Sequence, residues 1–309
     1  MLVLAAASSV AATPARPSTL GGFTAWAASG SRVAFVAATA FGRRGYLWAQ
    51  DFGAAQPRLL RTSPPVGEEE VDELAAGPNG SWAALERTAD GSSTLDVVSS
   101  RGGGAHVAAG GAVAALVGDG TFLGYLSVTP AGVVQLYRIT GARATRVATL
   151  AGVSAPQEVA AAGGTLAVRE QNGTVVVFTL HGRRLATITA RAASVALTAN
   201  RVVVRTRDRR LVVYGLRGGL VHDWLLAAKT WTAGLAAYGC YAVYLGANKA
   251  VHAVRLSNGR DRIVARAGTG WFFDGLSLQA PGAVVPLTTQ HGTTLRFLPT
   301  RALVEAFDR

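Results

Sequence analysis

The sequence contains almost no cysteine. Cys240 is the only one, so the chain can form neither an internal disulfide nor a metal site of several thiolates. It lies in the strand-like run 238–244, among tyrosines and small apolar residues. We therefore expect Cys240 to be a small buried hydrophobic residue rather than a reactive thiol.

Lysine is also scarce. Of the 30 basic residues only Lys229 and Lys249 are lysines, and against 18 acidic residues they give a formal net charge of +12. Such an excess of positive charge would suit a nucleic-acid partner. The arginines are nevertheless spread along the whole chain and form no basic block, which favours a solvated arginine-rich surface over a nucleic-acid interface.

Sequence motifs of catalysis and metal binding are missing. The five histidines occur in unrelated contexts without a His-x-x-His pair, so the spacing typical of zinc ligands is absent. There is no Gly-x-Ser-x-Gly elbow and no Walker loop. The sequence predicts no metal, no cofactor and no catalytic residue. A site assembled from distant segments stays open, because geometry rather than chain order defines such a site.

The N-terminus is similar to an export signal. Residues 1–12 form an uncharged apolar run that ends in small residues, and residues 13–18 are polar and contain proline, as around the cleavage site of a secreted protein. The basic residues that usually precede such a run are missing, which leaves open a start upstream of Met1. The alternative is that the run forms an extra β-strand. We expect a secreted or extracytoplasmic protein with no membrane span after the N-terminus, since later apolar runs are short.

The residues that the chain has in abundance favour β-structure. Half of the residues are hydrophobic and only 16% are charged, so a large core is available. Valine, threonine, glycine and alanine prevail over the helix formers lysine and glutamate. This composition is typical of an all-β protein with many tight turns.

A unit of about 40 residues recurs along the chain. In each unit, turn residues directly precede a β-branched or aromatic run, as in Pro78–Leu85 and Gly118–Tyr125, which indicates a hairpin. A second hairpin repeats in step, with Gly182, Gly218 and Gly259 in equivalent turn positions where positive φ is free of strain. The first strands of the units are predicted to begin near residues 22, 70, 112, 156, 193, 233 and 272.

Seven four-stranded units at this period predict a single seven-bladed β-propeller over residues 18–309, preceded by a signal and linker over residues 1–17. A lone blade cannot bury both of its faces, so the units must pack side by side. We expect no helix longer than about two turns. Ring closure should use the chain's own last strands, 294–297 and 303–307, and the protein should be a monomer.

Two of the repeats resemble known propeller groups. Pro78–Leu85 is similar to the Ser-Pro-Asp-Gly-x-x-Ile-Ala repeat of TolB-like propellers, and Val251–Arg260 resembles the Tyr-Ala-Leu-Asp hairpin of quinoprotein-like ones. The resemblance covers residues 20–305 and implies architecture rather than activity. Most units lack the tryptophan docking positions of true quinoproteins, so quinone binding is not implied.

Ligand sites of propellers usually lie on the face formed by the inter-blade loops and the loops between second and third strands. The acidic segment 64–73 is predicted to lie there. Glu70 and Asp72 are two apart on a strand and would point the same way, toward a cation or a sugar. The alternative is a solvated loop. Glu158 is a further carboxylate candidate at the channel mouth.

Two more segments are candidates on this face. Trp271 and Asp274, with Lys229 and Trp231 from the preceding inter-blade loop, would combine aromatic rings with a carboxylate, as in peptide or carbohydrate recognition. The alternative is that the rings fill the wedge between blades.

Arg205, Arg207 and Arg209 alternate along the chain and would clamp an anion if they share one side of a strand. The alternative is a hairpin edge that arginine keeps soluble.

These features favour a non-enzymatic recognition or scaffold domain that binds a protein, peptide or cell-envelope component. The alternative is a secreted hydrolase or lyase acting on glycan or peptide, with its site near Glu70, Asp72, Glu158 and Asp274. Two carboxylates about 5–9 Å apart beside an exposed aromatic ring would favour the enzyme.

Overall fold

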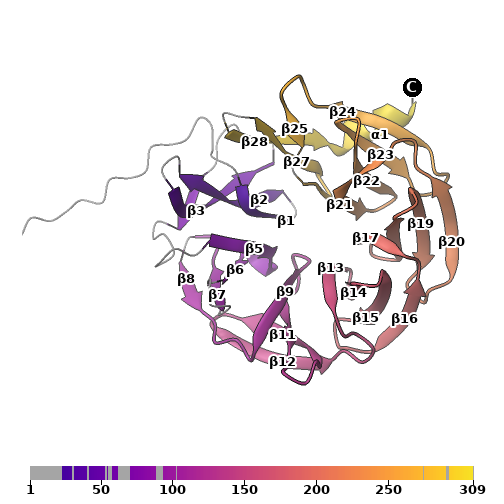
Figure 1. Ribbon diagram of the computed structural model, residues 1–309. Helices are drawn as coiled ribbons and strands as arrows, with labels where there is room; N and C mark the ends of the chain where they lie inside the picture. Colours follow the sequence, from indigo (N-terminus) through magenta and orange to yellow (C-terminus); the bar gives the residue numbers. More distant parts are fainter. Residues whose placement is uncertain are drawn as a thin grey trace, which may run out of the picture.

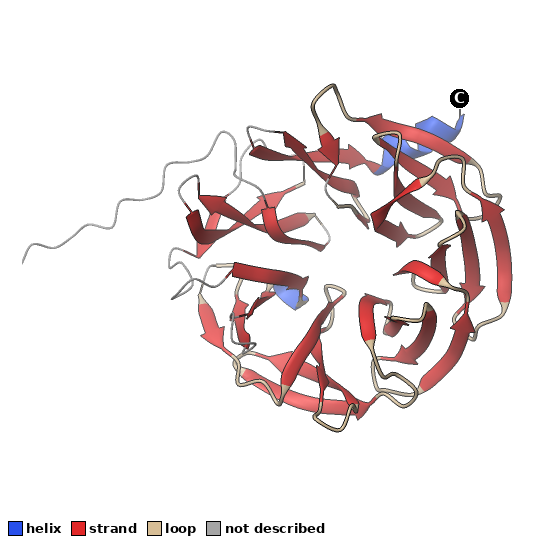
Figure 2. Cartoon of the chain, in the orientation of Figure 1, coloured by secondary structure: helices blue, strands red, loops and turns tan. Residues whose placement is uncertain are grey.

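Seven small antiparallel sheets follow one another around a ring in the computed structural model (Figure 1), and almost every element is a strand (Figure 2). The structure describes residues 23–29, 31–39, 42–52, 54, 58–61, 70–87, 93–101, 103–273, 275–289 and 292–308. The chain is therefore a seven-bladed β-propeller, which confirms the predicted fold.

The blades are numbered here in chain order. Blades 1 to 3 contain β1 (Phe23–Ser29), β2 (Arg32–Thr39), β3 (Gly42–Asp51), β4 (Arg58–Arg61), β5 (Glu70–Ala76), β6 (Trp82–Arg87), β7 (Ser93–Val98), β8 (Gly104–His106), β9 (Ala112–Gly118), β10 (Leu123–Val128), β11 (Val134–Thr140) and β12 (Arg143–Thr149). Blades 4 and 5 contain β13 (Pro156–Ala162), β14 (Thr165–Glu170), β15 (Thr174–Thr179), β16 (Arg184–Thr189), β17 (Ala192–Leu197), β18 (Arg201–Thr206), β19 (Arg210–Gly215) and β20 (Leu220–Leu225). Blades 6 and 7 contain β21 (Thr230–Tyr238), β22 (Tyr241–Gly246), β23 (Ala250–Arg255), β24 (Asp261–Arg266), β25 (Phe272–Phe273), β26 (Ser277–Gln279), β27 (Gly282–Thr289) and β28 (Gly292–Pro299).

The observed first strands begin at residues 23, 70, 112, 156, 192, 230 and 272, within three residues of the predicted starts. The turn glycines also behave as predicted. Gly182, Gly218 and Gly259 have φ values of 82°, 83° and 69°, a region that side chains with a Cβ rarely adopt. A Cβ on Gly259 would in addition collide with the indole ring of Trp224.

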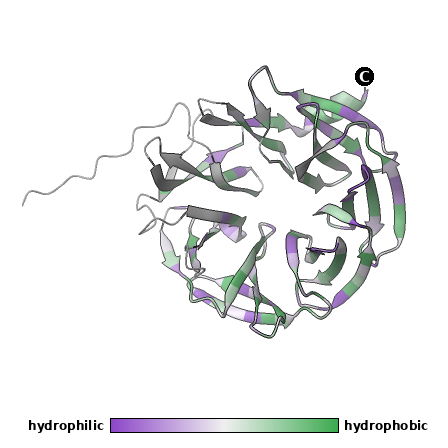
Figure 3. Ribbon diagram, viewed as in Figure 1, coloured by the Kyte–Doolittle hydropathy of each residue, from purple (hydrophilic) through white to green (hydrophobic). Residues whose placement is uncertain are grey.

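Burial differs between the strands of a blade. The middle strands are covered on both sides and are continuous apolar runs, such as the Thr-Val-Val-Val-Phe-Thr sequence of β15. The fourth strands form the outer rim, and the residues of β12 are exposed or half-buried. Hydrophobic residues are consequently buried in separate clusters between neighbouring blades rather than collected in one centre, and the coloured blades of Figure 3 show this distribution.

Blades 1 and 7 meet through apolar side chains. Phe35 and Trp48 of blade 1 form one buried cluster with Val284 of blade 7, and the rings of Phe52 and Phe297 pack edge to face with centroids 4.9 Å apart. These contacts close the ring between the two ends of the repeat.

The polypeptide backbone also contributes to this closure. The Gln279 side-chain amide donates to the carbonyl of Ala28 over 3.3 Å, which joins the ends of the innermost strands of blades 7 and 1. Residues 294–297 lie in β28 of the last sheet, as predicted. Residues 2–12, the alternative source of a closing strand, lie outside the described residues.

The end of the chain differs from the prediction. Residues 303–307, predicted as a strand, belong to the nine-residue helix α1 (Thr300–Asp308), so the predicted strand is wrong and the helix slightly exceeds two turns. The cause is that Leu303 and Phe307, four residues apart, lie on one face of a helix and are 1% and 2% exposed. Over so short a run the periodicity alone does not separate helix from strand, and packing on blades 6 and 7 decides.

Phe307 anchors this helix. Its ring stacks on Tyr241 with centroids 5.6 Å apart, and the guanidinium of Arg255 lies 5.1 Å from its centroid. We expect Phe307→Ala to lower the free energy of unfolding by about 3–5 kcal/mol, because a fully buried ring is lost. Glu305→Ala, on the exposed side of the same helix, should change it by less than about 0.5 kcal/mol. Urea denaturation measures both, and equal effects would contradict the observed helix orientation.

Candidate functional site

A depression of 610 Å³ lies at one end of the central channel. It is formed by the turns between the first and second strands of six blades, namely those of blades 1, 3, 4, 5, 6 and 7. The first strands surround the channel in order (Figure 1), each in contact with the next. The depression therefore opens on the face opposite to the inter-blade loops, where the sequence analysis placed the candidate ligand sites.

Small residues leave the space for this depression. Its lining includes Ala161, Ala162, Gly163, Ala199 and Gly239. The turn of blade 4 must be tight, because Gly163 has a φ of 56° and a Cβ there would come within 2.9 Å of the Ala199 Cα atom. Backbone groups and alanines thus form the wall, and few side chains reach into the opening.

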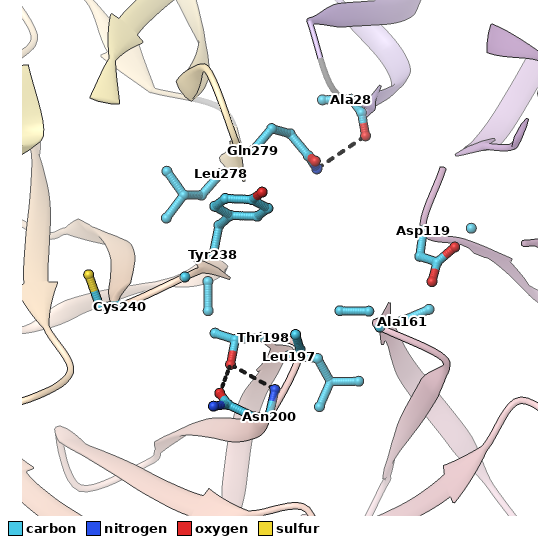
Figure 4. Close-up of a pocket in the computed structure, with 16 residues that line it drawn as sticks. Ala28, Asp119, Ala161, Leu197, Thr198, Asn200, Tyr238, Cys240, Leu278 and Gln279 are labelled. Carbon is cyan, nitrogen blue, oxygen red and sulfur yellow. Dashed lines mark hydrogen bonds between the residues drawn. The ribbon is translucent and has the colours of Figure 1, made fainter. Parts of the chain in front are cut away.

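Polar side chains from four blades line the opening, and two of them already form hydrogen bonds: Asn200 accepts from Thr198 of its own turn over 3.2 Å, and Gln279 donates to the Ala28 carbonyl over 3.3 Å. Figure 4 shows Asp119, Asn200, Tyr238 and Gln279 around it. Tyr238 is 48% exposed. Asp119 holds its own turn, because Oδ1 accepts hydrogen bonds from the backbone of Thr121 and Phe122 and from the Thr121 hydroxyl. Its Oδ2 atom makes no hydrogen bond within the described residues and is available to a ligand.

Cys240 belongs to the rim of this depression. It is exposed in the turn between β21 and β22, so the prediction of a buried strand residue is wrong. The cause is the position of the hairpin: β21 ends at Tyr238 and β22 begins at Tyr241, which leaves Gly239 and Cys240 as the turn.

The predicted acidic and aromatic residues whose backbone the structure describes lie toward the opposite end of the ring. Glu70 and Asp72 are in β5, where a β-bulge between residues 71 and 73 interrupts the alternation assumed for them. The side chains of Glu70, Asp72 and Trp231 lie outside the described part of the structure. The whole of Asp274 lies outside it as well. Lys229 is exposed and Trp271 is half-buried, in the inter-blade loops before blades 6 and 7. Whether these side chains converge stays a prediction.

Glu158 and Arg205 were predicted to belong to different sites, but they lie in one polar cluster between blades 4 and 5. Glu158 accepts from Arg169 Nε over 2.8 Å and from the Ser194 hydroxyl over 2.7 Å. Arg205 is 3% exposed. Burial lowers the pKa of its guanidinium, Glu158 opposes this effect, and Arg169 adds to it. The Glu158 carboxylate thus offsets the charge of two guanidiniums and is half-buried beside them.

Arg207 and Arg209 take other directions. A turn separates β18 from β19 after Thr206, and Arg207 is exposed in it. Arg209 has a φ of 67°, and its guanidinium donates to the carbonyl of Leu226 over 3.0 Å. The three arginines therefore have separate surroundings: one buried, one solvated and one bound to backbone.

A buried network next to Arg209 was not foreseen. Asp261 accepts hydrogen bonds from the Tyr244 hydroxyl, from His252 Nδ1 over 2.8 Å and from the Ala227 amide over 3.1 Å. The Tyr244 and His252 rings stack with centroids 4.7 Å apart. Burial, followed by the hydrogen bond to Asp261, raises the pKa of Tyr244. His252 is 3% exposed, so the network stabilises blade 6 rather than binding a ligand.

The residues of the depression were missed for a definable reason. The segments around Asn200 and Tyr238 were recognised in the sequence as hairpin turns, but a turn signal reports only local backbone geometry. Their convergence follows from ring closure, which no local pattern encodes.

Within the described part of the chain, no group of three His, Cys, Asp or Glu side chains could hold a metal ion. None of the helices in that part is long and apolar enough to cross a membrane.

No protein-family model matches the chain, and no curated protein matches its sequence. Similar solved structures include BamB from Moraxella catarrhalis, which is 16% identical with a TM-score of 0.53 over 90% of this chain and 86% of that one. Human WBSCR16 is 11% identical with a TM-score of 0.62 over 87% of each chain. The computationally designed Ika8 protein is 16% identical with a TM-score of 0.59 over 91% of this chain and 87% of that one. These likenesses show the propeller fold alone.

The Asp261 network predicts acid-sensitive stability. Burial would raise the pKa of Asp261, but the hydrogen bonds from His252 and Tyr244 outweigh it and hold the pKa below its ordinary value. The carboxylate therefore stabilises the fold above the unfolded pKa of about 3.9, and this contribution is lost as the pH falls through the lower folded value.

We expect Asp261→Asn to lower the free energy of unfolding by about 2 kcal/mol at neutral pH and by much less near pH 3. Urea denaturation across this range measures the difference. Asp51→Asn removes a more exposed ion pair with Arg32 and should cost less than about 1 kcal/mol. If Asp261→Asn lowers the free energy of unfolding by the same amount at every pH, the stabilising role given to the Asp261 carboxylate is contradicted.

Proposed function

We propose that the chain is an exported, non-enzymatic recognition module that binds a segment of another protein, a peptide or a cell-envelope component in its central depression. The observation that carries the proposal is the 610 Å³ opening, walled by small residues and supplied with polar side chains from four blades. Its size and its few convergent polar groups match a ligand pocket.

The chemistry of the lining favours binding over hydrolysis. Hydrolysis of a glycosidic bond usually needs two carboxylates, one acid and one base or nucleophile. Of the described residues that line the depression, Asp119 is the single carboxylate, and its Oδ1 atom is committed to the turn. The Glu158 carboxylate is bound by Arg169 and Ser194.

A polypeptide segment fits this lining best. Amide, hydroxyl and carboxylate groups from Asn200, Gln279, Tyr238 and Asp119 supply both donors and acceptors, as an extended backbone requires. The alanine walls supply apolar contact between them. The similar solved structures support the ring scaffold, and the choice of ligand rests on the lining itself.

Export rests on the sequence of residues 1–17, which lie outside the described residues. When the full chain is expressed in a bacterial host, the recovered protein should begin near residue 13, because residues 1–12 have the features of a cleaved signal. Intact-mass measurement reads the N-terminus directly. An exported product that retains Met1 would contradict this part of the proposal.

Filling the depression should abolish binding. Ala199 is exposed and lines the opening, so Ala199→Trp places an indole in it. Thr145→Trp, on the exposed side of β12, is the matched control. Peptides selected from a displayed library on the wild-type protein should bind the control equally and Ala199→Trp at least about tenfold more weakly, a difference of about 1.4 kcal/mol.

The single cysteine gives an independent readout. An environment-sensitive fluorophore on Cys240, at the rim, should change its emission when a selected peptide binds. Thermal unfolding confirms that both tryptophan variants are folded. Selected peptides that bind Ala199→Trp as tightly as the wild type, or that leave the Cys240 fluorophore unchanged, would contradict the proposed site.

A further inference from the structure

A second cavity, of 660 Å³, lies between blades 2 and 3. Its walls are the turns between the first and second strands and between the third and fourth strands of both blades. Turns of these two kinds lie at the same end of antiparallel blades, so this groove opens on the same face as the central depression. Blade 2 contributes no residue to the depression; its turn, the 3₁₀ segment η1 (Pro78–Gly80), lines the groove instead.

The groove is positively charged. Among the described residues, Arg101 and Arg138 are its ionisable lining residues, and no carboxylate side chain lines it. Both arginines are exposed, and no carboxylate in the described part of the chain forms an ion pair with either. Their guanidiniums are thus available to an anion from outside. The central depression has the opposite character, with Asp119 as its charged residue.

The ring of Phe122, which lines the groove, packs against Arg138. Its guanidinium carbon lies 5.1 Å from the centroid of the Phe122 ring, a cation–π arrangement. Phe122 is 2% exposed, and its backbone amide donates to Asp119 Oδ1 over 2.8 Å. A Cβ on Gly124 would come within 2.6 Å of this ring, so the glycine provides the room for it. This contact holds the guanidinium beside the ring, and within the described part of the chain its N–H groups make no hydrogen bond, which leaves them for an oxyanion.

Neutral hydrogen-bonding groups surround the two charges. Ser99, Ser100 and Thr140 line the groove, and the Ser100 carbonyl is fixed by Arg58 Nη2 over 2.6 Å. Val97 and Ile139 add apolar surface. A ligand that matches this lining carries oxyanions on a backbone that itself forms hydrogen bonds.

We propose that the groove between blades 2 and 3 binds the carboxylate side chains of an acidic polypeptide segment. Nucleic acid fits less well, because single strands need exposed aromatic rings on which bases stack and the Phe122 ring is covered. The site shares no residue with the central depression, so it can be tested independently of the function proposed above.

The probe is a fluorescein-labelled hexaglutamate peptide, with hexaglutamine as the neutral control. Anisotropy at about 20 mM salt, where surface charges are weakly screened, measures affinity. Arg101→Gln/Arg138→Gln removes both groove arginines. Arg143→Gln/Arg146→Gln removes the same charge from exposed positions of β12 in blade 3 and is the matched control. Thermal unfolding confirms the fold of each variant.

We expect hexaglutamate to bind the wild type and hexaglutamine not to bind. The groove variant should lose at least about tenfold in affinity, whereas the β12 variant should stay within about twofold. Arg138→Lys, which keeps the charge but cannot form a bidentate pair, should fall between the two. Ala199→Trp should bind hexaglutamate like the wild type.

Four results would overturn the proposal. Equal losses in the two double variants would mean that hexaglutamate responds to net charge alone. Equal binding of hexaglutamine, or no binding of hexaglutamate to the wild type, would show that the groove does not select an acidic peptide. Loss of binding in Ala199→Trp with no loss in the groove variant would place the peptide in the central depression instead.

Discussion

Apolar contact between neighbouring blades is the constraint on which the rest of this structure depends. Each boundary has its own buried cluster, and each cluster draws residues from the two blades that meet there. A four-stranded sheet that must be covered on both faces cannot fold alone. The ring satisfies this requirement for every blade once the last one meets the first. Phe35, Trp48 and Val284 make that last contact, and the hydrogen bond from Gln279 to Ala28 fixes its inner end.

Ring closure also creates the candidate site. Asn200 lies in the turn of one hairpin and Tyr238 ends the first strand of another, and nothing in their local sequence relates them to each other. They lie together because the first strands surround one channel, so their turns share one rim. Small side chains at this rim keep it open. Where blade 2 departs from the pattern with its 3₁₀ turn, the rim is interrupted and the cationic groove begins.

The sequence was informative where local chemistry determines local structure. Positive φ at Gly182 and the starts of the first strands could be predicted, because turn residues and apolar runs report on their own neighbourhood. The prediction was wrong for Cys240, because the strand before it ends at Tyr238 and the next begins at Tyr241, which places the cysteine in the turn. It was wrong for Phe307, where packing on neighbouring blades selects a helix. The partners of Glu158 and Arg205 come from different blades, and no spacing within a repeat could have paired them.

The two openings on one face have a consequence for binding strength. A partner long enough to reach both would make its second contact within an already formed complex, at an effective concentration set by the length of the connecting segment. Two weak contacts would then give tight binding together, and either one alone would let the partner leave. Since one opening is rimmed by neutral groups and a carboxylate and the other by arginines, such a partner would also have a fixed direction. The propeller would then distinguish the direction of the partner's chain as well as its composition.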